Sequence, residues 1–284
     1  IKPLHDLPEH LCFDEFKSVK SSDSNMSFII CDSTTHKLVD VVRDRKSYSL
    51  KKYFHRFEPK TRLKVKTISI DMYLPYIQLI KEMFPNAKII IDPFHIVQAL
   101  NRELNRTRVR VMNKHRYKDP KLYRKLKHYW KLILKNPNEL QNYKYNRYKL
   151  FESFITSKGI VDYILEKNPS LKNDYEVVHS LRECIQDRNY IEFKETIEAA
   201  TQLDLSPGLK RVLKTLMTYL PYIQNTCEYP TRTNGPIEGI NNKIKVLKRN
   251  AYGFRNYYHF RNRIILITKM FGPKQKGIKQ QLVA

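Results

Sequence analysis

Short β-type runs, rich in apolar residues and separated by polar connectors, occupy much of the first hundred positions and predict strands. Three such runs, at residues 11–16, 26–31 and 38–42, are joined by short polar connectors. We predict that they form an antiparallel meander. Two further runs, at residues 65–71 and 87–92, predict a fourth and a fifth strand.

Helical spacing takes over between these strands and after them. A first helix is predicted from an apolar face made by Leu50, Tyr53, Phe54 and Phe57, and a second from Ile77, Ile80, Met83 and Phe84. The resulting order, βββαβαβ, predicts a mixed sheet with helices packed against it.

From residue 96 to residue 229 the pattern predicts helix throughout. After Asn234 another helix is expected, because Pro236 suits the first turn of a helix. Its buried stripe is predicted to comprise Ile237, Ile240, Ile244 and Leu247. A last helix is predicted to use Phe260, Ile264, Ile267 and Phe271.

Charge changes this picture, because 53 Lys and Arg residues face 28 acidic residues and give a net charge of +25. Such an excess favours a polyanionic partner, namely DNA, RNA or an anionic membrane. A membrane is the weakest of these, since no apolar run approaches the roughly 20 residues needed to span a bilayer. We expect no membrane partner. Four distant cysteines and no signal-peptide pattern indicate a reducing, cytoplasmic setting.

The basic residues are distributed unevenly along the helical stretch. Residues 102–135 contain thirteen Lys and Arg against two acids, whereas residues 159–230 contain eleven acids against eight bases. We interpret the first part as a nucleic-acid face and the second as scaffold or a subunit contact. The alternative for the first part is a solvated helix, but solvated helices normally mix charges of both signs.

One carboxylate stands out near the end of the chain. Between residue 231 and residue 284 Glu238 is the only acid among twelve Lys and Arg residues. Amid cations that face phosphates, a lone carboxylate suggests a metal ligand in an enzyme that acts on nucleic acid. The competing interpretation is a salt-bridge partner near a helix start, where acids are favoured in any case.

Two aspartates lie on predicted strands. Asp14 belongs to the first strand and Asp71 ends the fourth; if these strands are neighbours, side-chain alternation brings the two carboxylates together. Mg²⁺ prefers oxygen ligands and keeps several waters, so two or three carboxylates and a substrate phosphate suffice. Two such ions ~4 Å apart serve in-line phosphoryl displacement. Each aspartate alone is weak evidence, because Asp is common at strand ends.

Asp92 and His95 follow the fifth strand. In one interpretation Asp92 caps the helix that begins near residue 94, and His95 packs nearby. In the other, the pair positions phosphates or supports a metal site. Other chemistry finds no support, since the sequence has no phosphate-binding G-x-x-x-x-G-K-[ST] loop, no G-x-S-x-G and no H-E-x-x-H.

Tyrosine is abundant, at nineteen residues, so a covalent tyrosine recombinase has to be considered. The Arg and His constellation that such an enzyme needs around its tyrosine is not recognisable. The tyrosine-rich stretches around Tyr143, Tyr145 and Tyr148, and at Tyr257 and Tyr258, are interpreted as packing or as stacking on nucleic acid.

Several phrases resemble the catalytic domain of the ISL3 family of bacterial insertion-sequence transposases. They are Phe13-Asp-Glu-Phe, Ser69-Ile-Asp-Met-Tyr-Leu-Pro-Tyr, Phe84-Pro-Asn-Ala-Lys-Ile-Ile-Ile-Asp-Pro-Phe-His, Thr233-Asn-Gly-Pro-Ile-Glu-Gly-Ile-Asn-Asn-Lys and Lys248-Arg-Asn-Ala-Tyr-Gly-Phe. The resemblance covers essentially the whole chain, with the motifs in order.

The resemblance implies an α/β, RNase H-like fold with a mixed sheet, interrupted by a large all-α insertion. It divides the chain into a first part of the core at 1–98, a helical insertion at 99–230 and the C-terminal core helices at 231–284. It implies a catalytic, metal-binding triad of Asp14, Asp71 and Glu238, with Asp92 and His95 matching the family's D-x-x-H signature. Family members usually begin with a zinc-binding segment and a helix-turn-helix, and neither is visible here.

The function expected is metal-dependent cleavage and strand transfer of double-stranded DNA, with Mg²⁺ replaceable by Mn²⁺. A homodimer is expected because two element ends must be paired. The residues expected to contact DNA are Arg106, Arg108, Arg110, Trp130, Asn241, Asn242, Lys245, Lys248, Arg249 and Arg255. Two alternatives remain: a transposase-derived DNA-binding protein without catalysis, and a structure-selective nuclease on the same fold.

Overall fold

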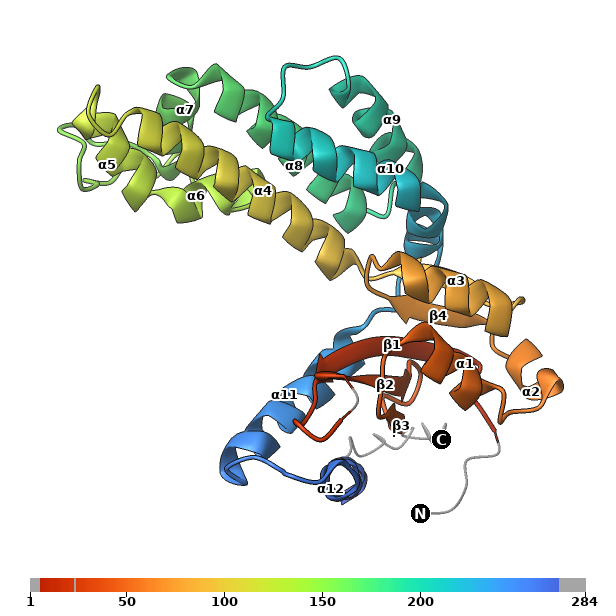
Figure 1. The fold of residues 1–284 in the computed structure, drawn as a ribbon. Helices are drawn as coiled ribbons and strands as arrows, with labels where there is room; N and C mark the ends of the chain where they lie inside the picture. The colour runs from red at the N-terminus through yellow and green to blue at the C-terminus, as the bar shows by residue number, and fades with distance from the viewer. Residues whose placement is uncertain (1–5, 23, 271–284) are drawn as a thin grey trace, which may run out of the picture. The chain divides into compact units, whose positions relative to one another are not determined.

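The computed structural model describes residues 6–22 and 24–270 of the chain. The chain divides into two compact units (Figure 1). The first, here called the sheet unit, comprises Ile1–Asp92 and Thr231–Ala284, and the second, the helical unit, comprises Pro93–Pro230. The helical unit is therefore inserted into the sequence of the sheet unit.

The sheet unit is built on five strands in the order β3-β2-β1-β4-β5. Their bounds are β1 His10–Lys17, β2 Met26–Asp32, β3 Leu38–Val42, β4 Thr67–Ile70 and β5 Lys88–Ile91. β1 pairs with β2 in antiparallel fashion and with β4 in parallel, so the sheet is mixed. The predicted α/β fold and the predicted meander of the first three strands are confirmed.

Aromatic side chains fill the face of the sheet that α1 (Ser47–Phe54) and α3 (Leu74–Met83) share. The ring of Phe13 on β1 stacks on Phe54 with centroids 5.6 Å apart, and Phe54 meets Phe84 edge to face at 4.9 Å. All three rings are fully buried, as a well-packed core requires. Between these helices the single-turn α2 (Pro59–Leu63) was not predicted, since one turn is too short to show a helical period.

The opposite face of the sheet is covered by α11 (Gly235–Asn250) and α12 (Tyr257–Met270), drawn in blue in Figure 1. Side chains from both helices and from β1–β3 form one apolar cluster, including Cys12, Phe16, Ile29, Cys31, Val41, Ile237, Ile240, Ile244, Phe260 and Ile264. The predicted stripes of these two helices are confirmed for Ile237, Ile240, Ile244, Phe260 and Ile264. Phe271 lies outside the described residues.

The helical unit contains α4 Pro93–Lys114, α5 Pro120–His128, α6 Trp130–Leu134, α7 Ser157–Glu166, α8 Pro169–Gln186, α9 Tyr190–Ala200 and α10 Pro207–Glu228, with the short 3₁₀ helix η1 Pro137–Glu139. The prediction of helix throughout is wrong for residues 140–156, which are non-helical. There Leu150 adopts a φ of 70°, in the left-handed region, which no α-helix accommodates.

A buried polar network joins three of these helices. The Thr107 hydroxyl on α4 donates to Asp174 Oδ2 on α8 at 2.7 Å, and Asp174 Oδ1 accepts from the backbone N–H of Ser206 at 2.9 Å. Ser206 is the N-cap of α10, and its own hydroxyl accepts from the backbone N–H of Leu209. Because Asp174 is fully buried, this network fixes α10 against α8 and α4 at a specific register.

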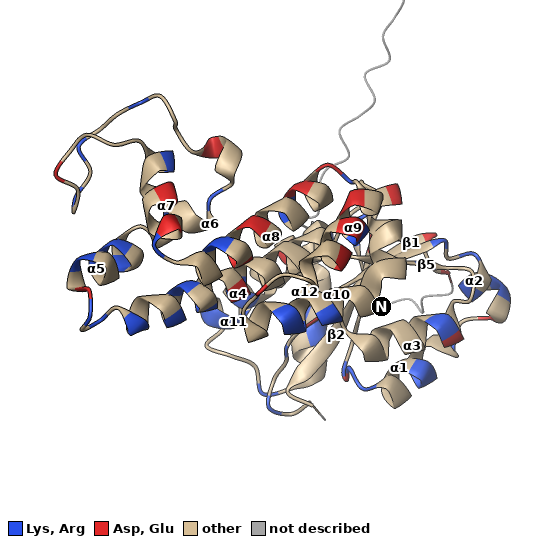
Figure 2. Ribbon diagram, turned by 90° about the horizontal axis from the view of Figure 1, so that it is seen from above, with Lys and Arg blue, Asp and Glu red and all other residues tan. Residues whose placement is uncertain are grey.

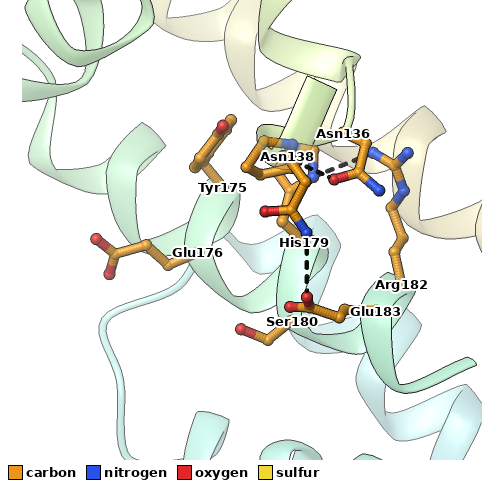
Figure 3. Close-up of a pocket in the computed structure, with 9 residues that line it drawn as sticks. Asn136, Asn138, Tyr175, Glu176, His179, Ser180, Arg182 and Glu183 are labelled. Carbon is orange, nitrogen blue, oxygen red and sulfur yellow. Dashed lines mark hydrogen bonds between the residues drawn. The ribbon is translucent and has the colours of Figure 1, made fainter. Parts of the chain in front are cut away.

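A second polar cluster lies beside a cavity of about 220 Å³ between α8 and residues 136–138 (Figure 3). The buried His179 ring donates from Nε2 to the Ile133 carbonyl at 3.1 Å, and its Nδ1 accepts from Arg182 at 3.2 Å. Arg182 also donates to the Leu134 carbonyl at 3.0 Å. Burial lowers the pKa of His179 to about 4, so this ring is a neutral structural link between α8 and α6.

Charge is segregated within the helical unit. Figure 2 shows Lys and Arg along α4 and α5, and Asp and Glu along α7, α8 and α9. In the part of the chain that the structure describes, no helix is long and apolar enough to cross a membrane.

Candidate metal centre in the sheet unit

The two strands that carry the predicted aspartates are neighbours. β1 and β4 run parallel with Cys12 opposite Ser69, and continuing this register by two residues brings Asp14 level with Asp71. Residues in register on adjacent parallel strands point to the same face of a sheet. Both aspartates are half-buried. The sequence predicted that the carboxylates of Asp14 and Asp71 would meet only if their strands were neighbours. In the structure β1 and β4 are paired.

Asp92 lies beside them. β5 pairs with β4 so that Ile91 is opposite Ile70, which places Asp92 next to Asp71 at the carboxyl ends of two parallel strands. A carboxylate oxygen of Asp71 and one of Asp92 lie within 4.8 Å of each other. Asp92 is only 5% exposed, and its backbone N–H donates to the Ile70 carbonyl. His95 follows three residues later, in the first turn of α4.

Helix α11 contributes two amide side chains to the aspartates. Asn241 Nδ2 donates to Asp14 Oδ2 at 2.7 Å. Asn234, the N-cap residue of the helix, donates from Nδ2 to Asp71 Oδ1 at 3.3 Å and to the Phe13 carbonyl at 3.2 Å. The helix therefore lies along β1 with amides on both carboxylates. Asn241 was expected to contact DNA, whereas the structure places its amide on Asp14.

Glu238 lies between these two asparagines on the helix. It comes four residues after Asn234 and three before Asn241, the spacings that align side chains on one helical face. The Glu238 side chain is exposed, and among the described residues it forms no ion pair. The interpretation of Glu238 as a salt-bridge partner therefore has no support in this part of the chain.

The donor set fits a divalent cation. Asp14, Asp71, Asp92 and Glu238 offer the hard carboxylate oxygens that Mg²⁺ and Mn²⁺ accept. The side-chain Oδ1 atoms of Asn234 and Asn241 are buried and have no hydrogen-bond partner among the residues that the structure describes, although both asparagines contact the aspartates. A buried amide oxygen without a partner is costly, and a cation or its water shell would satisfy it.

Cys12 is fully buried on the same face of β1 as Asp14. Burial raises the pKa of its thiol to about 12, so it stays protonated near neutral pH. Its Sγ donates to the Thr233 carbonyl at 3.3 Å, just before α11 begins. The thiol thus anchors the segment that delivers Asn234.

Cations extend the polar face of α11. Lys245, Arg249 and Arg255 are exposed, as is Asn242. Lys248 instead donates from Nζ to the backbone carbonyls of Lys17 and Ser18 at 3.0 and 2.9 Å, at the end of β1. Lys248 therefore fixes the helix to the sheet, in addition to any contact with DNA.

The expected DNA-contacting arginines of α4 differ in exposure. Arg106 and Arg110 are exposed and pair with the buried Glu103 at 3.3 and 3.0 Å. Arg108 is only 7% exposed and donates to the Leu126 carbonyl at 2.9 Å, a contact that ties α4 to α5. Arg108 is thus turned into the protein in this conformation. Trp130, the first residue of α6, is 39% exposed.

Sequence reasoning did not assign a role to Asn234. It placed Asn234 only at the start of a helix, which was predicted from Pro236. The available signal is the spacing of Asn234, Glu238 and Asn241, which puts three oxygen-bearing side chains on one helical face.

Comparison with known proteins places the chain in a family. A sequence model of ISL3 transposases, described as "Transposase", matches residues 11–264. The transposase for insertion sequence element IS1001 of Bordetella parapertussis is 27% identical over 257 residues, which cover 89% of this chain and 59% of that protein. No solved structure matched the chain.

A second relative, from Lactococcus lactis subsp. lactis, is 35% identical over 130 residues, covering 46% of this chain and 40% of that protein. It carries the name ATP-dependent protease, which describes that protein alone. The chain thus spans 59% and 40% of the lengths of these two relatives. Since the family match extends over most of the sequence, from β1 into α12, the chain belongs to the ISL3 family of transposases.

Proposed function

We propose that this chain is the catalytic domain of a DNA transposase in which Asp14, Asp71 and Glu238 hold two divalent cations. The observation that carries the proposal is the polar face of α11: the asparagines on either side of Glu238 reach Asp14 and Asp71. A glutamate on that face, between two amides directed at strand-borne aspartates, is suitably placed to complete an oxygen-rich metal site.

The arrangement of the chain supports an RNase H-like core. A mixed five-stranded sheet carries the aspartates, and helices cover both of its faces. Along the sequence, the helical unit lies between β5 and α11. In this proposal residues 1–98 and 231–284 form the core and residues 99–230 the insertion. The glutamate then comes from the sequence that follows the insertion, as the family resemblance implies.

When bound, Mg²⁺ or Mn²⁺ would supply an activated water or 3′-hydroxyl and stabilise charge on the phosphate in an in-line displacement. The protein needs no nucleophile of its own. Asn241 and Asn234 would orient the aspartate carboxylates through their N–H donors. Asp92 and His95 would support Asp71 or position the scissile strand.

Double-stranded DNA is the proposed substrate, both at the element ends and at the target. The exposed cations Lys245, Arg249 and Arg255 would neutralise backbone phosphates beside the carboxylates. On the helical unit, the exposed side of α4 and α5 would add further phosphate contacts, with Arg106 and Arg110 available and Arg108 serving as a packing residue. A homodimer would hold two ends together.

The test is Glu238→Gln, which keeps the size of the side chain and removes its charge. We expect this variant to lose Mg²⁺- or Mn²⁺-dependent cleavage of DNA that carries the inverted repeats flanking the gene. DNA affinity, measured by fluorescence anisotropy without metal, should be unchanged, because phosphate binding depends on the basic residues.

The matched control is Glu58→Gln. Glu58 is an exposed carboxylate of the same unit and pairs with Lys60 on the surface, at 2.7 Å. It should cleave like the wild type. Full activity of Glu238→Gln would overturn the triad. Cleavage of any branched DNA by the wild type, without preference for element ends, would indicate a structure-selective nuclease. DNA binding without metal and without cleavage by the wild type would indicate a non-catalytic binding protein.

A further inference from the structure

The non-helical segment 141–155, between η1 and α7 of the helical unit (Figure 1), exposes an unusual set of side chains. Tyr143, Tyr145 and Phe154 are 78%, 65% and 67% exposed. Large aromatic side chains bury well and usually do so, since each removes a large apolar area from water. Three exposed rings within twelve residues therefore call for a functional explanation.

The segment is held in a defined conformation at its base. The backbone of Gln141 bonds to Ser157 and Lys158, with Gln141 N–H donating to the Ser157 hydroxyl at 2.8 Å. Further out, Asn146 and Ile155 exchange two backbone hydrogen bonds of 3.0 and 3.1 Å. The two arms of the segment are therefore paired, as in a short hairpin.

A second set of aromatic residues anchors the segment to the helices. Tyr148 and Phe151 pack on Tyr129 with ring centroids 6.2 and 5.8 Å away, and Phe151 also meets Tyr163 at 5.4 Å. The amino group of Lys125 lies 4.2 Å from the centre of the Phe151 ring. Tyr148 and Phe151 thus supply the anchoring contacts, which leaves the three exposed rings without a role in the core.

The exposed rings alternate with cations. Lys144, Arg147 and Lys149 are exposed, and residues 141–151 contain no acid, Glu152 being the one carboxylate of the segment. Exposed aromatic rings interleaved with cations are suited to single-stranded nucleic acid, because bases stack on the rings and the cations follow the phosphates. Duplex DNA offers its phosphates but keeps its bases stacked inside.

We propose that residues 141–155 form a base-stacking element that binds unpaired nucleotides through Tyr143, Tyr145 and Phe154. This inference rests on the proposed function, because transposition exposes unpaired DNA. It adds which part of the DNA substrate the segment recognises. A second copy of the chain is a less suitable occupant, because a surface with this excess of cations repels its own copy.

The test uses the full chain without metal, a fluorescein-labelled 20-nucleotide oligo-dT and a labelled blunt-ended duplex, each titrated by anisotropy. Combining Tyr143→Ala with Tyr145→Ala should weaken oligo-dT binding by at least about 10-fold, as expected for the loss of stacked bases. Duplex binding should change by less than about 3-fold, since the three cations remain. Changing both tyrosines to Phe should restore oligo-dT affinity, because the ring is retained.

The control variant is Tyr48→Ala, because Tyr48 is also 78% exposed but lies on α1 of the sheet unit. It should bind both DNAs like the wild type. Unchanged oligo-dT affinity in the double Ala variant would overturn the proposal, as would equal losses on the two DNAs. A loss of self-association without a change in DNA affinity would assign the rings to a protein contact and also overturn it.

Failure of this proposal and failure of the proposed function are distinguishable. Glu238→Gln should bind oligo-dT like the wild type, since base stacking does not involve the metal-binding carboxylates. If instead cleavage proves to be metal-dependent while the ring variants bind oligo-dT normally, the catalytic proposal stands and the base-stacking element does not.

Discussion

Single side chains show how the sheet and α11 cooperate at the candidate metal centre. Side-chain alternation predicts that Asp14 lies on the same strand face as Cys12 and Asp71 on the same face as Ser69, so the sequence could propose this pair of carboxylates. The asparagine partners could not be identified, because the bond from Asn234 to Asp71 joins positions 163 residues apart. Local patterns carry no information about such a contact.

Asn241→Ala tests this cooperation. Removing the amide takes away the N–H that orients Asp14, and loss of an orienting partner typically costs 10- to 100-fold in metal affinity. We expect Mn²⁺ binding, followed by electron paramagnetic resonance, to weaken by about that factor while duplex DNA affinity is retained. Asn250→Ala, at the exposed end of the same helix, is the control. Equal Mn²⁺ affinity in the two variants would contradict the orienting role.

At the level of elements, regular strands and long helices were predictable and short or irregular segments were not. All five strands coincide with the predicted runs to within two residues at each end. Residues 140–156 fall within the stretch that was predicted to be helical throughout, yet Asn146 and Ile155 pair instead. Phe151, within the segment, packs on Tyr129 outside it, so tertiary contacts override the local preference.

The link from α8 to α6 through His179 predicts a pH-dependent stability. In the unfolded chain this histidine gains a proton at its ordinary pKa of 6.5, whereas burial lowers the pKa in the folded protein to about 4. Between these pH values the unfolded state binds more protons, so stability is full above pH 6.5 and falls as the pH approaches 4. The loss should reach about 3 kcal/mol at most.

Urea unfolding of the full chain between pH 7 and pH 4.5, followed by far-ultraviolet circular dichroism, measures this effect. His179→Gln keeps an N–H donor for the Ile133 carbonyl but does not titrate. The variant should therefore lose less stability on acidification than the wild type. Identical pH profiles for the two proteins would show that the histidine remains charged or exposed.

On the scale of the whole molecule, each unit has a core of its own. The helical unit contains the buried Thr107, Asp174 and Ser206 network, and the sheet unit has apolar layers on both faces. We expect residues 93–230, produced alone, to fold with a cooperative thermal transition, because the network and the surrounding apolar contacts are complete within that range. A broad, non-cooperative transition would contradict this independence.

The coverage of the sheet by α11 and α12 has a consequence for biosynthesis. A ribosome completes all five strands and the whole helical unit before it begins these two helices. Until then the apolar side chains that α11 and α12 cover stay exposed on the sheet, including Phe16, Ile29 and Val41. Glu238 has not yet been synthesised at that stage. A prematurely terminated chain would carry the strand aspartates beside an open hydrophobic face. Under the proposed function it would be a substrate for chaperones or proteases and unable to cut DNA, so the segment that contains α11 and α12 completes folding and activity together.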